Sequence, residues 1–359
     1  MEFHQAVLQV EAASFVAISF CFCLPNPMIT NPLWPSEIMH EFLKEDIINV
    51  KSWFDVGDCN YEHDHKDETT PESGIVYCNI EHIHEFFRKC EYTDNKYVVV
   101  SGFSDFGITY QQEHPVAIDM VKTLPFIKQH IPEIGYEDLR VRSRCDRERC
   151  DENHTYSIKS YAWTYSTIKS IPSNVIKWFT VNSLVEQPRI QGIPFGIGKD
   201  ATEDILQAKK YNSEEKTNLL YINWEDRTNI ERIQLKSYFY SADFDWVTLV
   251  QEPLDFKQYL EQLSSHKYCL CPEGNGIDTY RFLECIYMGT IPIVFDSPAM
   301  RYLSDLPILI VKTLDDLSYD NLMSNYDSLI NKATEESMRK AKMSYWKDEI
   351  NKAAELIHG

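Results

Sequence analysis

Residues 267–295, KYCLCPEGNGIDTYRFLECIYMGTIPIVF, decide the fold of this chain. Their pattern predicts a strand over 267–271, a loop over 272–278, a helix over 279–288 and a second strand over 290–295. Two strands joined by a helix of this length form a parallel βαβ unit. We therefore expect an α/β protein built on parallel sheets.

The loop before this helix is predicted to bind an anion. It contains Gly274, Asn275 and Gly276, and it leads into the N-terminus of the helix at Asp278 and Thr279. Backbone N–H groups that point outward from such a loop form a site for a phosphate group.

Two charged residues on the following helix extend the prediction to a nucleotide. Arg281 and Glu284 lie three residues apart and so share a helix face. The planar guanidinium group of an arginine suits a diphosphate, and the carboxylate suits a ribose diol. The alternative is an ion pair between the two side chains on the helix surface.

A second polar group follows an earlier predicted strand, over 219–224. Arg227, Thr228 and Arg232 lie at the start of the helix predicted over 228–240. The carboxyl ends of parallel strands gather along one edge of a sheet, so these residues are expected near the 272–278 loop. The alternative is the ordinary polarity of a helix start with solvated arginines.

Both segments resemble the exostosin-like glycosyltransferases. The pattern P-E-G-N-G-I-D-T-x-R-x-x-E-x-x-x-x-G-T-I-P-I-V is similar to the donor-binding motif of that family, and residues 219–232, LLYINWEDRTNIER, are similar to the first strand and helix of its C-terminal domain. The resemblance covers residues 176–300. It implies two Rossmann-like domains that face each other across a cleft, the GT-B architecture. It also implies transfer of a sugar from a nucleotide-sugar, with UDP favoured, to a glycan or glycoprotein acceptor, with inversion and without an obligatory metal.

The length of 359 residues also favours two domains. Strands are predicted over 75–79, 96–102 and 175–182, with helices over 81–90 and 115–130, and later strands over 246–251 and 307–312 with a helix over 255–266. The predicted organisation is an acceptor-side α/β domain over 1–185, a crossover over 186–216, a donor-binding domain over 217–312 and C-terminal helices over 313–359. The amphipathic pattern over 337–357 predicts the last helix, and the resemblance implies that it returns to the first domain.

Inverting transfer requires a base that accepts the proton of the acceptor hydroxyl. Asp105 follows the strand-like run 97–101 and is the leading candidate, with Glu113 and His114 in reserve. The alternative is that Asp105 caps a turn or a helix.

Composition narrows the possible partners and compartment. The 55 acidic and 35 basic residues give a net charge of −20, which argues against a nucleic-acid partner. The ten cysteines include no C-x-x-C pair, so we expect a reduced, cytoplasmic chain in which the C-x-C pairs pack as small apolar residues. The apolar stretch 14–24 is too short to cross a bilayer and predicts a buried strand without firm membrane association.

Two other interpretations stay open. Asp243 and Asp245 form a D-x-D triplet that would hold a divalent metal in a metal-dependent transferase, and the charged loop with His63, His65 and Asp67 contains metal-ligand residue types. The chain could also be a nucleotide- or glycan-binding protein without catalysis. The leading prediction includes no metal, and no cofactor apart from the nucleotide-sugar as co-substrate.

Overall fold

The computed structural model describes residues 46–61, 71–102, 107–110, 165–168, 171–208, 216–225 and 229–358. All of them belong to one compact unit, residues 32–359. The described strands form two parallel sheets of five strands each and one parallel pair. The predicted α/β class with parallel sheets is confirmed, whereas the arrangement of two domains across a cleft, with the predicted domain boundaries, stays a prediction.

The first sheet has the strand order β1-β2-β3-β6-β7. Its strands are β1 (Cys59–Asn60), β2 (Gly74–Tyr77), β3 (Tyr97–Ser101), β6 (Val175–Thr180) and β7 (Ile190–Gly192). Every residue of the central strand β3 is buried, as expected from its continuous apolar sequence. Strand β7 lies inside the stretch predicted as a crossover. It pairs with β6 and completes this sheet.

Helix α4 (Ile83–Cys90) packs on the first sheet. It follows a short 3-10 turn, η3 (Ile80–His82). The turn and the helix together cover the range 81–90, so the predicted helix is confirmed. The ring of Phe87 meets the Trp178 ring edge-on at 5.1 Å. The separate parallel pair consists of β4 (Gly107–Tyr110) and β5 (Tyr165–Ile168). The elements predicted over 14–24 and 115–130 lie outside the described residues.

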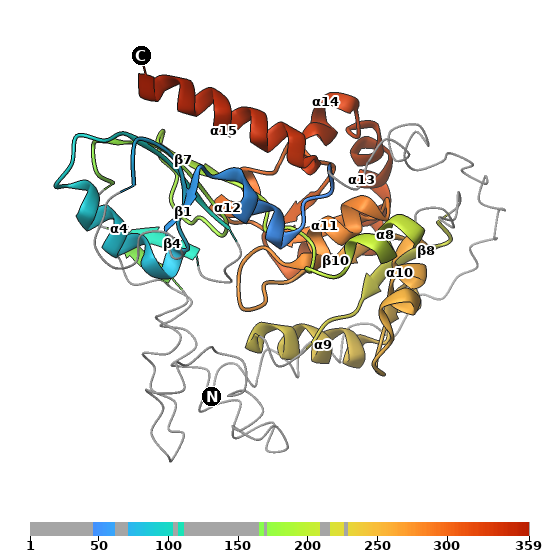
Figure 1. The fold of residues 1–359 in the computed structure, drawn as a ribbon. Helices are drawn as coiled ribbons and strands as arrows, with labels where there is room; N and C mark the ends of the chain where they lie inside the picture. The colour runs from blue at the N-terminus through green and yellow to red at the C-terminus, as the bar shows by residue number, and fades with distance from the viewer. Residues whose placement is uncertain are drawn as a thin grey trace, which may run out of the picture. The chain divides into compact units, whose positions relative to one another are not determined.

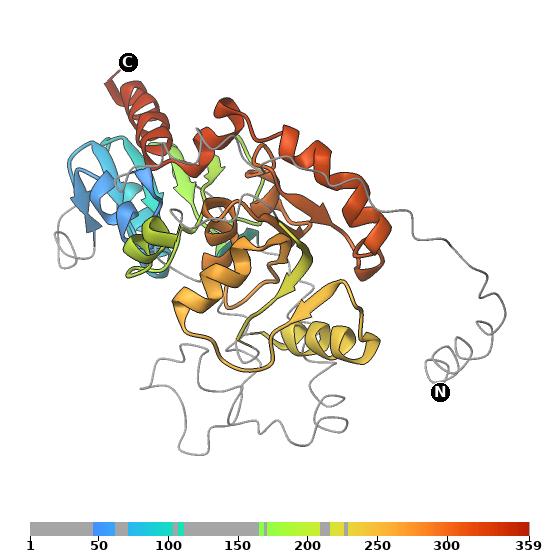
Figure 2. The same ribbon diagram turned by 90° about the vertical axis from the view of Figure 1, so that its right-hand side faces the viewer.

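The second sheet has the order β12-β11-β10-β8-β9. Its strands are β8 (Asn218–Ile222), β9 (Val247–Leu249), β10 (His266–Leu270), β11 (Ile291–Phe295) and β12 (Leu309–Val311), and they are connected by α9 (Ile230–Ala242), α10 (Phe256–Ser264) and α11 (Tyr280–Tyr287). Figure 2 shows α9 and α10 in yellow and light orange beside this sheet. The βαβ unit predicted over 267–295 is confirmed as β10, α11 and β11.

The strand order of the second sheet reverses between β8 and β10. From β8 the chain passes through α9 to β9 on one side, and then through α10 to β10 on the other side of β8. Ligands of open α/β sheets bind outside the carboxyl ends of the strands at such a reversal. Residues 223–225 follow the end of β8, and the loop over 271–279 follows the end of β10. The described strands of the first sheet, by contrast, follow one another in chain order.

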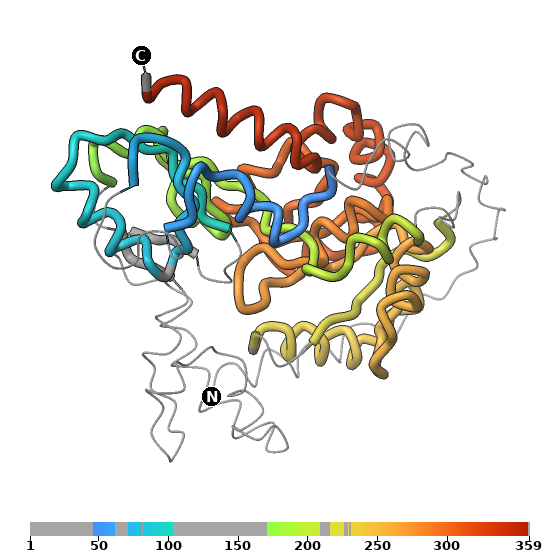
Figure 3. The backbone as a smooth tube through the Cα atoms, in the orientation of Figure 1, coloured from blue at the N-terminus to red at the C-terminus, as the bar shows by residue number. Residues whose placement is uncertain are grey.

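The last helix, α15 (Met343–His358), packs against β2, β3 and β6 of the first sheet (Figure 1). The end of the chain thus returns to the first sheet, as the resemblance implies. Figure 3 shows the blue start of the described chain beside the red start of this helix, where the Ser344 N–H donates to Asp46 Oδ1. Trp346 packs edge-on against Trp53, with ring centroids 6.5 Å apart.

The helix predicted over 337–357 begins later than expected. Helix α14 (Glu335–Met338) and a 3-10 turn, η7 (Arg339–Ala341), precede it, and Lys342 has an extended backbone that separates them from α15. The remaining helices are α8 (Thr202–Ala208), α12 (Pro298–Arg301) and α13 (Tyr319–Asn331). Within the described ranges, no helix has the length and apolar character of a membrane span.

Candidate functional site

Arg232 on α9 holds the loop that follows β10. Its Nε donates to the Glu273 carbonyl at 2.8 Å, and its Nη2 donates to the Pro272 carbonyl at 3.0 Å. Nη1 donates to the Glu225 carbonyl in the loop after β8, at 3.2 Å. A Cβ atom at Gly274 would lie only 2.8 Å from Nη2, so the close approach of this guanidinium requires a glycine. Arg232 therefore joins the two loops at the reversal of strand order.

Asn229, the N-cap of α9, adds a second connection between the same loops. Its Nδ2 donates to the Gly274 carbonyl at 3.2 Å, and its Oδ1 accepts a hydrogen bond from the Glu231 N–H. Because Arg232 is buried and engaged with carbonyl groups, the structure assigns it a role in shaping the loop. Asn275 and Gly276 lie in this same loop.

Arg281 lies at the reversal without a bonded partner. It forms no hydrogen bond or ion pair with the residues that the structure describes, and its Nε atom is buried. Burial lowers the pKa of Arg281, but the neighbouring Tyr259, on α10, and Glu284 raise it, so the guanidinium stays charged. Burial raises the pKa of Tyr221, on β8, and the charge of Arg281 lowers it. The residues that act on or respond to Arg281 thus come from β8, α10 and α11, the elements that meet at the reversal of strand order.

Glu284 is buried beneath Arg281 on the same helix. The Tyr259 hydroxyl donates to its Oε2 at 2.8 Å. Burial raises the pKa of Glu284, while the charge of Arg281 and the hydrogen bond from Tyr259 lower it. The alternative of an ion pair on the helix surface requires an exposed Glu284 carboxylate. The structure buries this carboxylate instead.

Asp278 ties the loop to segments that follow strands of the first sheet. Its N–H donates to Asn182 Oδ1 at 2.8 Å, and its Oδ2 accepts from the Phe195 N–H at 2.7 Å. The Gly274 N–H likewise donates to the Gly276 carbonyl, at 2.9 Å. The N–H groups of Gly274 and Asp278, both expected to face an anion, are thus bonded within the protein.

The Asp278 carboxyl group is unusual in its environment. It is only 3% exposed, and burial raises its pKa to about 7, although the N–H groups of Phe195 and Thr279 lower it. Its Oδ1 accepts no hydrogen bond from the described residues. Asp278 is therefore a buried carboxyl group at the contact between the two sheets.

Unpaired polar atoms concentrate at the N-terminus of α11. Among the described residues, six buried side-chain polar atoms have no hydrogen-bond partner, and three of them are Asp278 Oδ1, Thr279 Oγ1 and Arg281 Nε. Each such atom costs about 1–3 kcal/mol, and most buried polar atoms are paired in folded proteins. Three of these atoms lie within four residues, where they are available to a polar ligand.

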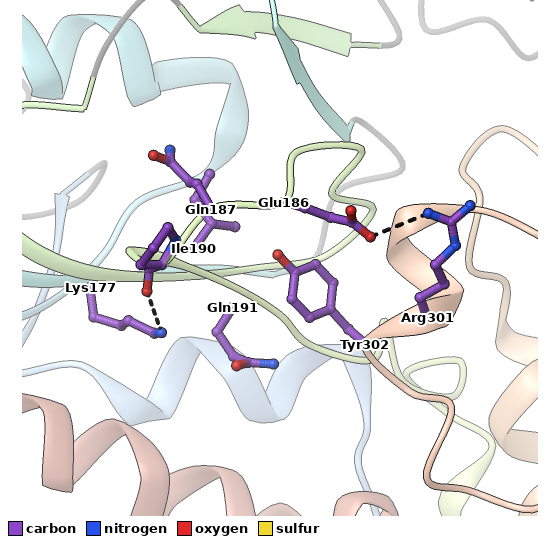
Figure 4. A pocket seen from close by; sticks show the side chains of 8 residues that line it. Lys177, Glu186, Gln187, Ile190, Gln191, Arg301 and Tyr302 are labelled. Atoms are coloured by element: carbon purple, nitrogen blue, oxygen red, sulfur yellow. Dashed lines mark hydrogen bonds and ion pairs between the residues drawn. The ribbon is translucent and has the colours of Figure 1, made fainter.

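A groove lies between the first sheet and the segment after β11 (Figure 4). Its volume is about 430 Å³, within the range of small-molecule sites. It is lined by polar side chains and one aromatic ring, with two apolar residues: Lys177, Glu186, Gln187, Pro188, Ile190, Gln191, Arg301 and Tyr302.

The cations of this groove are paired. Arg301 Nε and Nη2 bind Asp296 at 2.7 and 2.9 Å, and Nη1 lies 3.5 Å from Glu186 Oε1. Lys177 Nζ donates to the Pro188 carbonyl at 2.8 Å. The groove therefore offers amide, carboxylate and hydroxyl groups to a ligand rather than uncompensated positive charge.

Several predicted site residues lie outside the described residues. These are Asp105, Arg227 and Thr228, together with the reserve candidates Glu113 and His114 and the loop with His63, His65 and Asp67.

The D-x-D pair lies away from the reversal of strand order. Asp243 and Asp245 are exposed in the turn between the end of α9 and the start of β9, at the amino end of the sheet. The loops after β8 and β10 lie at the opposite, carboxyl end. The geometry of the described residues therefore does not favour a metal at this pair beside Arg281.

Two partners in the site were not anticipated from the sequence. Tyr259 gave no signal, because a tyrosine in an amphipathic helix usually belongs to the core. Asn182 has a left-handed backbone, with φ of 53°, so the strand predicted over 175–182 ends at Thr180. Asparagine is one of the few residues that adopt this conformation readily, and its position after a strand is the signal that could have identified it.

Comparisons with known proteins add little to this geometry. No family model matches the chain, and a search of curated proteins finds no match. A solved structure of the glycotransferase of kitacinnamycin is 11% identical, and the alignment covers 83% of this chain and 76% of that one with a TM-score of 0.30. A similarity of this degree supports no conclusion about fold or function, and the exostosin-like resemblance stays a prediction.

Proposed function

We propose that this chain is a glycosyltransferase that binds a nucleotide-sugar at the reversal between β8 and β10. The observation that carries the proposal is Arg281, a charged group without a bonded partner among the described residues, beside the unpaired hydroxyl of Thr279. Both stand at a helix N-terminus where a diphosphate is favoured. The resemblance of the same residues to the exostosin-like donor motif supports the proposal and favours UDP.

In this proposal Arg281 binds the diphosphate and stabilises the charge that develops as the nucleoside diphosphate leaves. Preorganised cations and hydrogen-bond donors at a developing charge are among the largest contributions to catalysis. Thr279 Oγ1 would donate to a phosphate oxygen, and Glu284 would accept from the ribose. Arg232 and Asn229 act indirectly, because they hold the loop over 271–279 in place.

The acceptor is proposed to enter through the groove of Figure 4. Gln187, Gln191 and Glu186 present hydrogen-bonding groups of the kind that bind sugar hydroxyls, and Tyr302 adds an aromatic face. Asp105 follows β3, the central strand of the first sheet, and is proposed as the base of an inverting reaction.

The proposal is tested by the release of nucleoside diphosphate from UDP- and GDP-sugars in the presence of a panel of glycan acceptors. Arg281→Ala should lower the rate by at least about 100-fold, as removal of a transition-state donor does. Arg339→Ala is the matched control, because the Arg339 side chain is 44% exposed and pairs with Glu336 on the surface. Equal rates for the wild type and Arg281→Ala would refute the site.

Two further outcomes separate the alternatives. Inhibition of transfer by a chelator, together with a similar loss of activity in Asp245→Asn, would favour a metal-dependent transferase. Binding of a nucleotide-sugar without release or transfer would favour a binding protein on the same scaffold.

A further inference from the structure

A cluster of three cysteines, Cys269, Cys271 and Cys285, lies where the loop over 271–279 begins. Cys269 is on β10, Cys271 follows the end of this strand and Cys285 is on α11. All three are reduced and buried, with exposures of 0%, 4% and 0%. Their Sγ atoms lie within 4.8 Å of one another, and those of Cys271 and Cys285 are 3.6 Å apart. No element of the proposed sugar transfer uses these thiols.

We propose that the three-cysteine cluster binds one copper(I) ion in trigonal coordination. Three sulfur atoms at about 2.3 Å from a common ion in one plane lie about 4.0 Å apart. The observed separations therefore need only small side-chain adjustments. Thiolate ligands favour soft cations such as copper(I).

The number of ligands distinguishes copper(I) from zinc. Structural zinc sites have four ligands in a tetrahedron. Within the described part of the chain, the group of candidate ligands at this position contains the three cysteines and no fourth histidine, cysteine or carboxylate. Three sulfur ligands complete the trigonal coordination of copper(I), whereas tetrahedral zinc would lack its fourth ligand.

Arg281 partly offsets the charge of the loaded cluster. Three thiolates with one copper(I) ion carry a net charge of −2, which is costly to bury without compensation. The guanidinium of Arg281 is close enough to interact electrostatically with Cys269 and Cys271. The ion would join the end of β10 to α11, on either side of the loop. The inference rests on the thiols themselves and does not depend on the proposed sugar transfer.

The test is a competition for copper(I) between the full-length reduced protein and the chromogenic chelator bathocuproine disulfonate, without oxygen. The wild type should withdraw one copper(I) ion per chain into the cluster. Cys285→Ala should weaken this binding by at least about 100-fold, since loss of a direct ligand exceeds the loss caused by its outer-sphere partners. Cys90→Ala is the matched control, because Cys90 is equally buried on α4, away from the cluster, and this variant should bind as the wild type does.

A second measurement keeps the inference testable if Cys285→Ala does not fold. X-ray absorption of the copper-loaded wild type should show three sulfur neighbours at one distance. Nitrogen or oxygen neighbours, or a wild type that holds copper no better than a folded Cys285→Ala, would overturn the inference and leave the cysteines as small apolar core residues.

Discussion

Asp278→Asn should make the stability of this protein less dependent on pH. The Asp278 carboxyl is buried, and burial raises its pKa from the ordinary 3.8 to about 7. A raised carboxyl pKa means that the folded state disfavours the charged form. The contribution of this group to the free energy of unfolding is therefore greatest below about pH 4, and it is lost as the pH rises towards 7.

The size of the effect follows from the same two values. A difference of one pKa unit corresponds to about 1.4 kcal/mol, so the full difference corresponds to about 4 kcal/mol as an upper limit. Asparagine has the shape of the protonated carboxyl group and stays neutral. It keeps an oxygen that can accept from the Phe195 N–H, and it removes the burial of a charge.

Urea unfolding of the wild type and Asp278→Asn at pH values from 4 to 8 measures this difference. The variant should gain stability relative to the wild type as the pH rises, by up to about 4 kcal/mol at pH 8. Asp245→Asn is the control, because Asp245 is an exposed carboxylate in a surface turn. If the curves for the wild type and Asp278→Asn run parallel across this range, the reasoning about the buried charge is wrong.

Two further substitutions test the packing around the site. Gly192→Ala should cost about 1–3 kcal/mol of stability, because its Cβ would lie 2.3 Å from Tyr302 Cδ2, whereas the Cβ of Gly198→Ala would lie 3.7 Å from its nearest neighbour, Tyr280 Cδ2, and this variant should cost less. Equal urea midpoints for the two variants would contradict this. Tyr259→Phe removes the hydroxyl that donates to the buried Glu284 and should cost about 1–3 kcal/mol. An unchanged urea midpoint would show that this hydrogen bond is unimportant.

The βαβ unit could be predicted because its signals are local. The apolar runs of β10 and β11 and the turn residues between them lie within 29 consecutive residues. The reversal of strand order between β8 and β10 could not be predicted in this way. Strands that are buried on both faces have similar apolar sequences, so their order in a sheet depends on packing between distant segments.

The start of α15 illustrates the limit of periodicity. Met338 and Ala341 are buried and continue the apolar pattern of Met343 and Trp346 backward along the chain. The sequence therefore resembles one long helix. The break at Lys342 becomes apparent only where Ile47 pairs with it, nearly 300 residues away in the chain.

The candidate site was predictable in its residue types and less so in its hydrogen bonds. Thr279 and Arg281 were identified from the loop and helix pattern, and the structure leaves both with unpaired polar atoms. The bond between the Asp278 N–H and Asn182 joins residues 96 positions apart. Such a contact depends on how the segments after β6 and β10 meet, and no local pattern encodes it.

The central claim is that Arg281 binds the diphosphate of a nucleotide-sugar. The most direct measurement is thermal unfolding of the purified protein with UDP, GDP and their sugar conjugates, for the wild type and Arg281→Ala. A ligand that binds only the folded state raises the unfolding midpoint. At a ligand concentration 100 times the Kd, it adds about 2.7 kcal/mol to the free energy of unfolding. We predict a rise with UDP or a UDP-sugar that disappears in Arg281→Ala. No rise with any nucleotide, or an equal rise in the variant, would contradict the claim.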